Sequence, residues 1–142
     1  MKRIDQVSET SRDRAAGLLG AGLLLLGAVL LAPSPVRAAE PTALEIVMLP
    51  PYCQARLSGD RAAMEQWSAA LGKEVHLHIH HYCYGLVYVN RANQTFEQRK
   101  RRYLLNQAIS EFDYVLKRWP PTSTLYAEAQ GQKALAQMLE QP

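Results

Sequence analysis

Apolar residues recur every three or four positions between Leu104 and Trp119, and this spacing constrains the fold more than any other feature of the chain. Such a stripe covers one face of an α-helix, and the two prolines at 120–121 would end that helix. Thr95 and Gln98 are spaced as a capping box, so we expect the helix to begin there. The predicted core stripe comprises Leu104, Leu105, Ala108, Ile109, Phe112, Val115, Leu116 and Trp119.

Three other segments are predicted to be helical. Asp60 can cap an amphipathic helix that begins after it and ends at Gly72. A last helix is expected to start near Ser123 or Thr124. Between them, residues 75–92 are rich in β-branched and aromatic side chains, which favour strands, but the segment runs for about seventeen residues without a turn signal and is too long for a typical strand. We therefore predict a helix there.

The fold class that follows is all-α, with about four helices in antiparallel hairpins over residues 59–142. Residues 39–58 contain several prolines and are predicted to form an extended lead-in.

The first 38 residues have the organisation of a secretory signal peptide. A basic stretch is followed by the apolar run AAGLLGAGLLLLGAVLLA, a Pro-Ser-Pro break and the small residues of Val36-Arg37-Ala38. We expect cleavage after Ala38 and a periplasmic or secreted protein of about 104 residues, one small domain. An uncleaved inner-membrane anchor is the alternative, because the apolar run is close to membrane-spanning length.

The balance of basic and acidic residues changes once residues 1–38 are removed. They hold five of the 16 basic and three of the 13 acidic residues, which leaves 11 basic and 10 acidic residues in the remainder. A nearly neutral domain gives no support to nucleic-acid binding.

Both cysteines, Cys53 and Cys83, lie after the expected cleavage site. Two cysteines in a small exported domain favour a structural disulfide, and their separation excludes CxxC redox and CxxCH haem motifs.

Several of these residues resemble the tetratricopeptide repeat, a helix–turn–helix unit of about 34 residues. The resemblance covers roughly residues 60–141, although 23 positions separate Gly85 from Ala108 where the family has about a dozen. It implies that Gly85 allows close approach of the second helix, that Ala108 fills the crossing and that Phe112 supplies bulk. Members of this family usually bind other proteins. The matching positions are His81, Tyr84, Gly85, Tyr88, Ala108, Phe112 and Pro120.

All four histidines lie between residues 76 and 81. In a helix, His76, His80 and Cys83 would share one face, while His78 and His81 would lie on another. Two histidines and a thiolate suit zinc or copper, but a cysteine in a disulfide is no longer a thiolate ligand. We expect packed or surface histidines, with His81 in the core and one of its ring nitrogens hydrogen-bonded. Metal binding and a pH-responsive contact are the alternatives.

The run Arg99-Lys100-Arg101-Arg102 is the other concentrated feature. A solvated helix face is the simpler interpretation, and a docking surface for an acidic protein or anionic lipid is the functional one. No catalytic triad, phosphate-binding glycine loop or informative carboxylate pair is present. The sequence thus predicts an exported accessory or assembly protein that is not an enzyme, needs no cofactor and binds a protein partner. A periplasmic copper- or zinc-binding protein is the alternative function.

Overall fold

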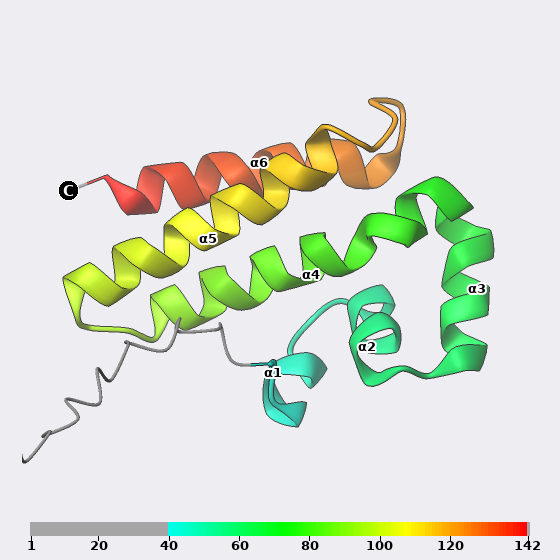
Figure 1. Cartoon of the computed structure of the whole chain (residues 1–142), viewed down its shortest axis with the longest axis horizontal. Coiled ribbons are helices and arrows are strands. Elements are labelled where there is room, and N and C mark those ends of the chain that lie inside the picture. The colour runs from blue at the N-terminus through cyan, green and yellow to red at the C-terminus, as the bar shows by residue number, and fades with distance from the viewer. Residues whose placement is uncertain (1–39, 142) are drawn as a thin grey trace, which may run out of the picture. The chain divides into compact units, whose positions relative to one another are not determined.

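The computed structural model describes residues 40–141, which belong to one compact unit. They form six α-helices and no β-strand, so the predicted all-α class is confirmed (Figure 1). The expected signal peptide lies outside the described residues. None of the helices within 40–141 has the length and hydropathy needed to cross a bilayer. The helices are α1 (Ala43–Val47), α2 (Pro51–Ser58), α3 (Arg61–Leu71), α4 (Lys73–Asn93), α5 (Gln98–Leu116) and α6 (Thr124–Glu140).

The helices α4, α5 and α6 form two consecutive antiparallel pairs (Figure 1). Helix α5 packs against both of its neighbours, and α6 touches α4 over a much smaller area. Helices α4 and α6 therefore run in the same direction. Helix α2 packs on α4, and α3 leads into the start of α4 at a steep angle to it (Figure 1). This arrangement leaves part of α4 facing the space between α1 and α6.

Helix α3 has the predicted ends. The Asp60 side chain accepts a hydrogen bond from the Ala63 amide at 3.1 Å, which satisfies one free N–H of the first turn. Gly72 ends the helix with a φ of +85°, a conformation that glycine adopts without steric cost. The histidine-rich segment is helical as predicted, and α6 begins at Thr124.

The prediction of an extended lead-in over residues 39–58 was wrong, because this segment contains α1 and α2. Thr42 and Glu45 form a capping box that starts α1. Pro51 occupies the first turn of α2, where its missing N–H costs nothing, and Gly59 ends that helix with a φ of +75°. Pro50 and Pro51, which were interpreted as a break in secondary structure, therefore stand at the start of α2. Residues 40–141 contain six helices rather than about four.

The expected capping box at Thr95 and Gln98 is also absent. The Thr95 hydroxyl instead donates to the Arg91 carbonyl at 2.8 Å, and α5 begins at Gln98 with Glu97 in the cap position. At its other end α5 stops at Leu116, before the expected Trp119. The Trp119 side chain is nevertheless buried, and its indole Nε1 donates to the Val75 carbonyl at 3.1 Å.

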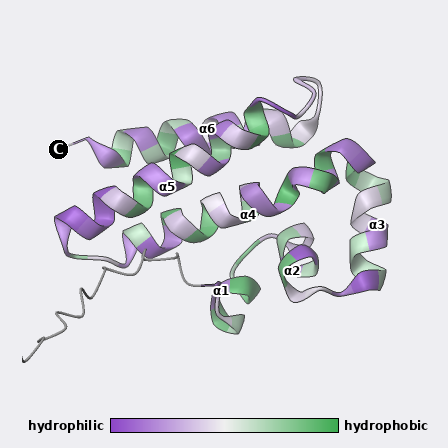
Figure 2. Ribbon diagram, viewed as in Figure 1, coloured by the Kyte–Doolittle hydropathy of each residue, from purple (hydrophilic) through white to green (hydrophobic). Residues whose placement is uncertain are grey.

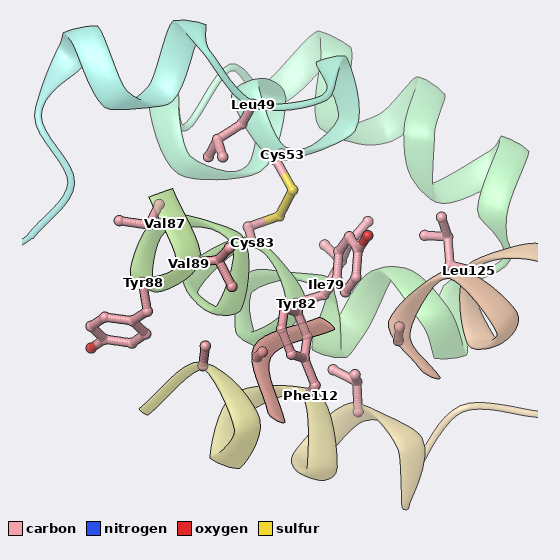
Figure 3. Packing of buried hydrophobic residues seen from close by; sticks show 14 of the residues in the cluster. Leu49, Cys53, Ile79, Tyr82, Cys83, Val87, Tyr88, Val89, Phe112 and Leu125 are labelled. Atoms are coloured by element: carbon pink, nitrogen blue, oxygen red, sulfur yellow. A yellow bond between two sulfur atoms is a disulfide. The ribbon is translucent and has the colours of Figure 1, made fainter. Parts of the chain in front are cut away.

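The core lies where α4 meets α2, α5 and α6 (Figure 3). Apolar and polar residues alternate along each helix, which agrees with one buried face per helix (Figure 2). Of the predicted stripe, Ile109 and Leu116 are only half-buried, while its other members are buried. The largest fully buried side chains are Tyr82, Phe112, Ile79, Leu105, Val87 and Val115.

Candidate functional site

The surface of α4 that faces α1 and α6 is hollowed by two adjoining pockets, which we call the α4 groove. Met48 and Asn90 line both pockets. The pocket beside α1 has a volume of about 420 Å³ and is lined by Leu44, Glu45, Met48, Asn90, Asn93 and Gln94. The pocket beside α6 has a volume of about 200 Å³ and is lined by Met48, Leu49, Pro50, Leu86, Val89, Asn90, Glu128 and Gln132.

One wall of the groove carries exposed apolar side chains. Leu44 and Met48 lie one helical turn apart, and each is 74% exposed. Val47, between them, is 61% exposed. Exposed apolar side chains that gather beside a hollow are typical of a surface that binds a protein or another apolar ligand.

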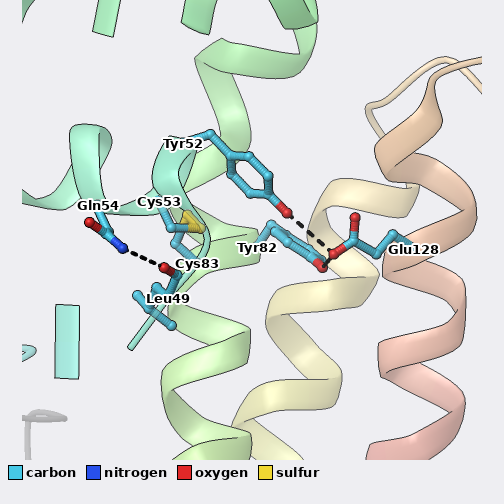
Figure 4. Close-up of a disulfide and its surroundings, with 7 residues drawn as sticks. All are labelled: Leu49, Tyr52, Cys53, Gln54, Tyr82, Cys83 and Glu128. Atoms are coloured by element: carbon cyan, nitrogen blue, oxygen red, sulfur yellow. Dashed lines mark hydrogen bonds between the residues drawn. A yellow bond between two sulfur atoms is a disulfide. The ribbon is translucent and has the colours of Figure 1, made fainter. Parts of the chain in front are cut away.

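An ion pair holds this wall against α4. Arg91 Nη2 donates to Glu45 Oε2 at 3.0 Å, and Arg91 Nε donates to the other carboxylate oxygen. The Arg91 guanidinium, helped by hydrogen bonds from Thr42, lowers the pKa of Glu45 to about 2, although burial opposes the shift. The Gln54 side chain also donates to the Leu49 carbonyl at 2.8 Å (Figure 4). The wall is therefore fixed by contacts at both of its ends.

The predicted disulfide joins α2, the helix that follows the wall in the chain, to α4. Cys53 in α2 and Cys83 in α4 are fully buried, bonded to one another, and have Cα atoms 5.4 Å apart (Figures 3 and 4). This covalent link keeps α2 on α4 and so limits how far the preceding wall can move from the floor of the groove.

Glu128 of α6 stands at the other side of the groove. Its Oε1 accepts hydrogen bonds from the Tyr82 hydroxyl at 2.6 Å and the Tyr52 hydroxyl at 3.2 Å (Figure 4). Burial, and then the Glu128 carboxylate, raise the pKa of both tyrosines well above the ordinary value, so the phenols remain protonated donors. This carboxylate thus joins α2, α4 and α6.

The four histidines lie in two different environments. The prediction that His81 packs in the core was wrong. His81 is half-buried at the surface, where its Nδ1 lies 2.6 Å from Glu111 Oε2 and its ring stacks on Tyr114. The expected hydrogen bond on one ring nitrogen is present, but the expected core position is taken by the neighbouring Tyr82. His78 contacts the edge of the same Tyr114 ring.

His76 is buried and His80 is half-buried on the other face of α4. His76 Nε2 and His80 Nδ1 are shielded from solvent and have no hydrogen-bond partner among the described residues. Burial lowers the pKa of His80 to about 4, and it also lowers the pKa of His76 and of His78. Within residues 40–141 no group of three or more metal-binding side chains is assembled, and Cys83 is in the disulfide. Metal binding by the histidine-rich segment stays an alternative prediction.

Only some of the residues that match the repeat signature lie close together in the structure. Gly85 lies directly against Phe112, and Ala108 and Tyr88 are buried nearby in the interface between α4 and α5. Tyr84 is half-buried and its hydroxyl donates to Glu40 at 2.9 Å. Pro120 follows the end of α5, as expected for a residue that closes a helix.

The basic run forms the first turns of α5. Arg99, Lys100 and Arg102 are exposed, and Arg101 is half-buried. Arg102 Nε lies 3.7 Å from Glu140 Oε1 of α6. These side chains do not line the α4 groove.

Comparison with known proteins gives no match: no family model, no curated protein and no solved structure is significantly similar to the chain.

Proposed function

We propose that this chain is an exported, non-catalytic accessory protein that binds another protein through the α4 groove. The observation that carries the proposal is the pair of exposed apolar side chains, Leu44 and Met48, on a wall that the Glu45–Arg91 ion pair holds on α4 and that leads directly into the disulfide-linked α2. Fixing a binding surface in advance reduces the entropy lost when a partner docks.

The arrangement of the hairpins supports the same function. In the tetratricopeptide-repeat interpretation, α4 and α5 form one repeat and α6 begins the next. The contact of Gly85 with Phe112 agrees with the close approach that this interpretation requires. A unit of one and a half repeats is too short for a long superhelical groove, so we propose that α1 and α2 supply the missing wall.

Export is supported by two features of the sequence. The first 38 residues have the order of a signal peptide, and the buried Cys53–Cys83 bond fits an oxidising compartment such as the periplasm. The basic run Arg99-Lys100-Arg101-Arg102 is proposed as a secondary contact for an acidic partner or for anionic lipid, outside the groove.

Affinity capture from the native cell envelope tests the proposal, with Met48→Asp compared against Met138→Asp. The two methionines are 74% and 72% exposed, but only Met48 lines the groove. We expect the captured partner to be lost with Met48→Asp and kept with Met138→Asp, and the protein to fractionate with the periplasm. Repeating the capture at high salt measures the contribution of the basic run. Loss of the partner only with Met138→Asp would indicate that the binding surface lies on α6 and not in the α4 groove.

A further inference from the structure

The loop between α4 and α5 carries the most exposed large apolar side chain of residues 40–141. Phe96 is 99% exposed, so its ring makes almost no contact with the rest of the described chain. Leaving such a ring in water is unfavourable, because its burial would remove a large apolar area from water. The loop lies at the end of the helical bundle opposite α3 (Figure 1). An unpartnered apolar group therefore projects from that end of the bundle.

Positive charge is concentrated directly after this side chain. Residues 97–102 contain four basic residues and one acidic residue, Glu97. Within the part of the chain that the structure describes, only Arg102 of the basic run forms an ion pair, with Glu140 of α6. No side chain of the described residues caps the first turn of α5, so its free N–H groups add to the positive potential. The end of the bundle thus joins an apolar ring to a basic surface.

The chain also enters the described bundle at this end. Arg91, in the last turn of α4, donates from Nη2 to the Glu40 carbonyl at 3.3 Å. The apolar run that resembles an export signal ends at Ala32, eight residues before Glu40. Eight extended residues reach at most about 30 Å. While such a signal is held in the membrane during export, this end of the bundle is therefore within about 30 Å of the bilayer.

We propose that the α4–α5 loop and the first turn of α5 bind the surface of an anionic lipid bilayer. Phe96 inserts between the headgroups, and Arg99 and Lys100 pair with the lipid phosphates. Aromatic side chains favour the interface between membrane and water, and basic residues close to the surface strengthen the attraction to anionic lipid. The inference rests on the proposed function for a location outside the cytoplasm, but not on the α4 groove.

The form of this surface favours a bilayer over an acidic protein. Phe96 and the basic run do not line the α4 groove or the hollow beside His81 and Tyr114, so they form a protruding surface. A protein partner would have to supply a fitted pocket for the ring together with carboxylates at its rim, because aromatic residues contribute strongly to protein interfaces only where they are well packed. An anionic bilayer supplies an apolar region beneath a layer of phosphates over its whole surface.

Cosedimentation with lipid vesicles tests the inference. Residues 40–141 belong to one compact unit, so the protein is prepared from Ala39 onwards, without the apolar run that would itself bind a bilayer. Vesicles of phosphatidylcholine with an equal amount of phosphatidylglycerol are compared with vesicles of phosphatidylcholine alone. The test variants are Phe96→Ser and the double variant Arg99→Gln with Lys100→Gln.

The matched controls lie near the other end of α4. Leu77→Ser removes a side chain that is 61% exposed in the second turn of α4. The double variant Arg61→Gln with Lys73→Gln removes two exposed basic residues, so it changes the net charge by the same amount. Circular dichroism verifies that each variant is folded.

We expect the wild type to bind the anionic vesicles and to bind phosphatidylcholine alone far more weakly. Phe96→Ser should weaken binding to the anionic vesicles about ten-fold, through loss of the inserted ring. Arg99→Gln with Lys100→Gln should weaken it about 25-fold, since each basic residue near the surface contributes about five-fold. Both controls should stay within about two-fold of the wild type, because charges distant from the surface are screened.

Insertion of the ring is measured separately with Phe96→Trp. Its additional tryptophan emission, taken as the difference from the wild type, should shift to shorter wavelength with the anionic vesicles. Vesicle binding that needs Arg99 and Lys100, but neither changes in Phe96→Ser nor shifts this emission, would overturn the proposed insertion.

The remaining outcomes separate this inference from the groove. If the protein binds no vesicles and the double variant Arg99→Gln with Lys100→Gln loses a partner in the affinity capture, the surface binds an acidic protein and the inference is overturned. The groove proposal would still stand, because Met48→Asp tests it. Vesicle binding that is lost in Met48→Asp but kept in Phe96→Ser would contradict both, since the α1 wall would then be the membrane surface.

Discussion

Gly85 of α4 and Phe112 of α5 are in direct contact, and the space between them excludes even a methyl group. A Cβ atom placed on Gly85 would lie 2.5 Å from Cε1 of the Phe112 ring, which is itself fully buried. Ring atoms in a filled core cannot move away without disturbing their neighbours. This contact therefore sets how closely α4 and α5 approach, and with it the position of the groove floor.

Gly85→Ala is expected to destabilise the protein by about 1–3 kcal/mol, the usual cost of overpacking a core. Urea unfolding followed by circular dichroism measures the change. Gly131→Ala is the matched control, because nothing lies within 4 Å of a Cβ at that position of α6. Alanine there should stabilise the helix by up to about 1 kcal/mol. Equal stability changes in the two variants would show that the contact is not tight.

Removing the disulfide should lower the free energy of unfolding by about 3–4 kcal/mol, because Cys53 and Cys83 are 30 residues apart and the bond restricts the unfolded chain. The double variant Cys53→Ala with Cys83→Ala avoids a free thiol, and urea unfolding compares it with the wild type. A reducing agent should destabilise only the wild type. A difference of less than about 1 kcal/mol would argue against a structural role for the bond.

Acid should destabilise the protein partly through His80. Burial, with the nearby charges of His81, Arg56 and His78, lowers the pKa of His80 to about 4, whereas an unfolded chain has a histidine pKa near 6.5. Between these values the unfolded state binds more protons, so the free energy of unfolding falls as the pH falls from about 6.5 to about 4.

Urea unfolding at about pH 7 and about pH 4.5 checks this prediction. The loss of stability on acidification should be smaller in His80→Leu than in the wild type, because leucine does not titrate. An equal loss in both proteins would mean that His80 is not buried as a neutral imidazole.

The α1 wall should loosen when Glu45 loses its charge. Its pKa is lowered to about 2 by Arg91, so its contribution is present above about pH 4.5 and is lost as the pH falls towards 2. Glu45→Gln mimics the protonated form at neutral pH. Hydrogen exchange should accelerate in residues 43–49 and stay unchanged in α6. Unchanged exchange in α1 would show that the ion pair does not hold the wall.

Local patterns in the sequence were sufficient to predict most of the helices. Asp60 and Gly72 mark both ends of α3, and the stripe from Leu104 marks α5, because these signals act within a few residues. Helices α1 and α2 were missed because they are short, five and eight residues, and carry little apolar periodicity.

The groove could not be predicted from such patterns. Glu128 meets Tyr82 and Tyr52 across 46 and 76 residues, and nothing near it in the alanine-rich α6 distinguishes it from a solvent-exposed glutamate. The disulfide was predicted from the count of cysteines and the expected compartment. His81 was misplaced because its neighbour Tyr82, about 100° further round the helix, takes the buried position.

Site-specific photo-crosslinking in living cells tests the central claim most directly. A benzophenone amino acid is placed at Met48 in one variant and at Met138 in another, and the adducts are analysed by electrophoresis and mass spectrometry. If the α4 groove binds a protein partner, Met48 should give a discrete adduct with one protein and Met138 should give none. Adducts from Met138 alone, or from neither position, would contradict the claim.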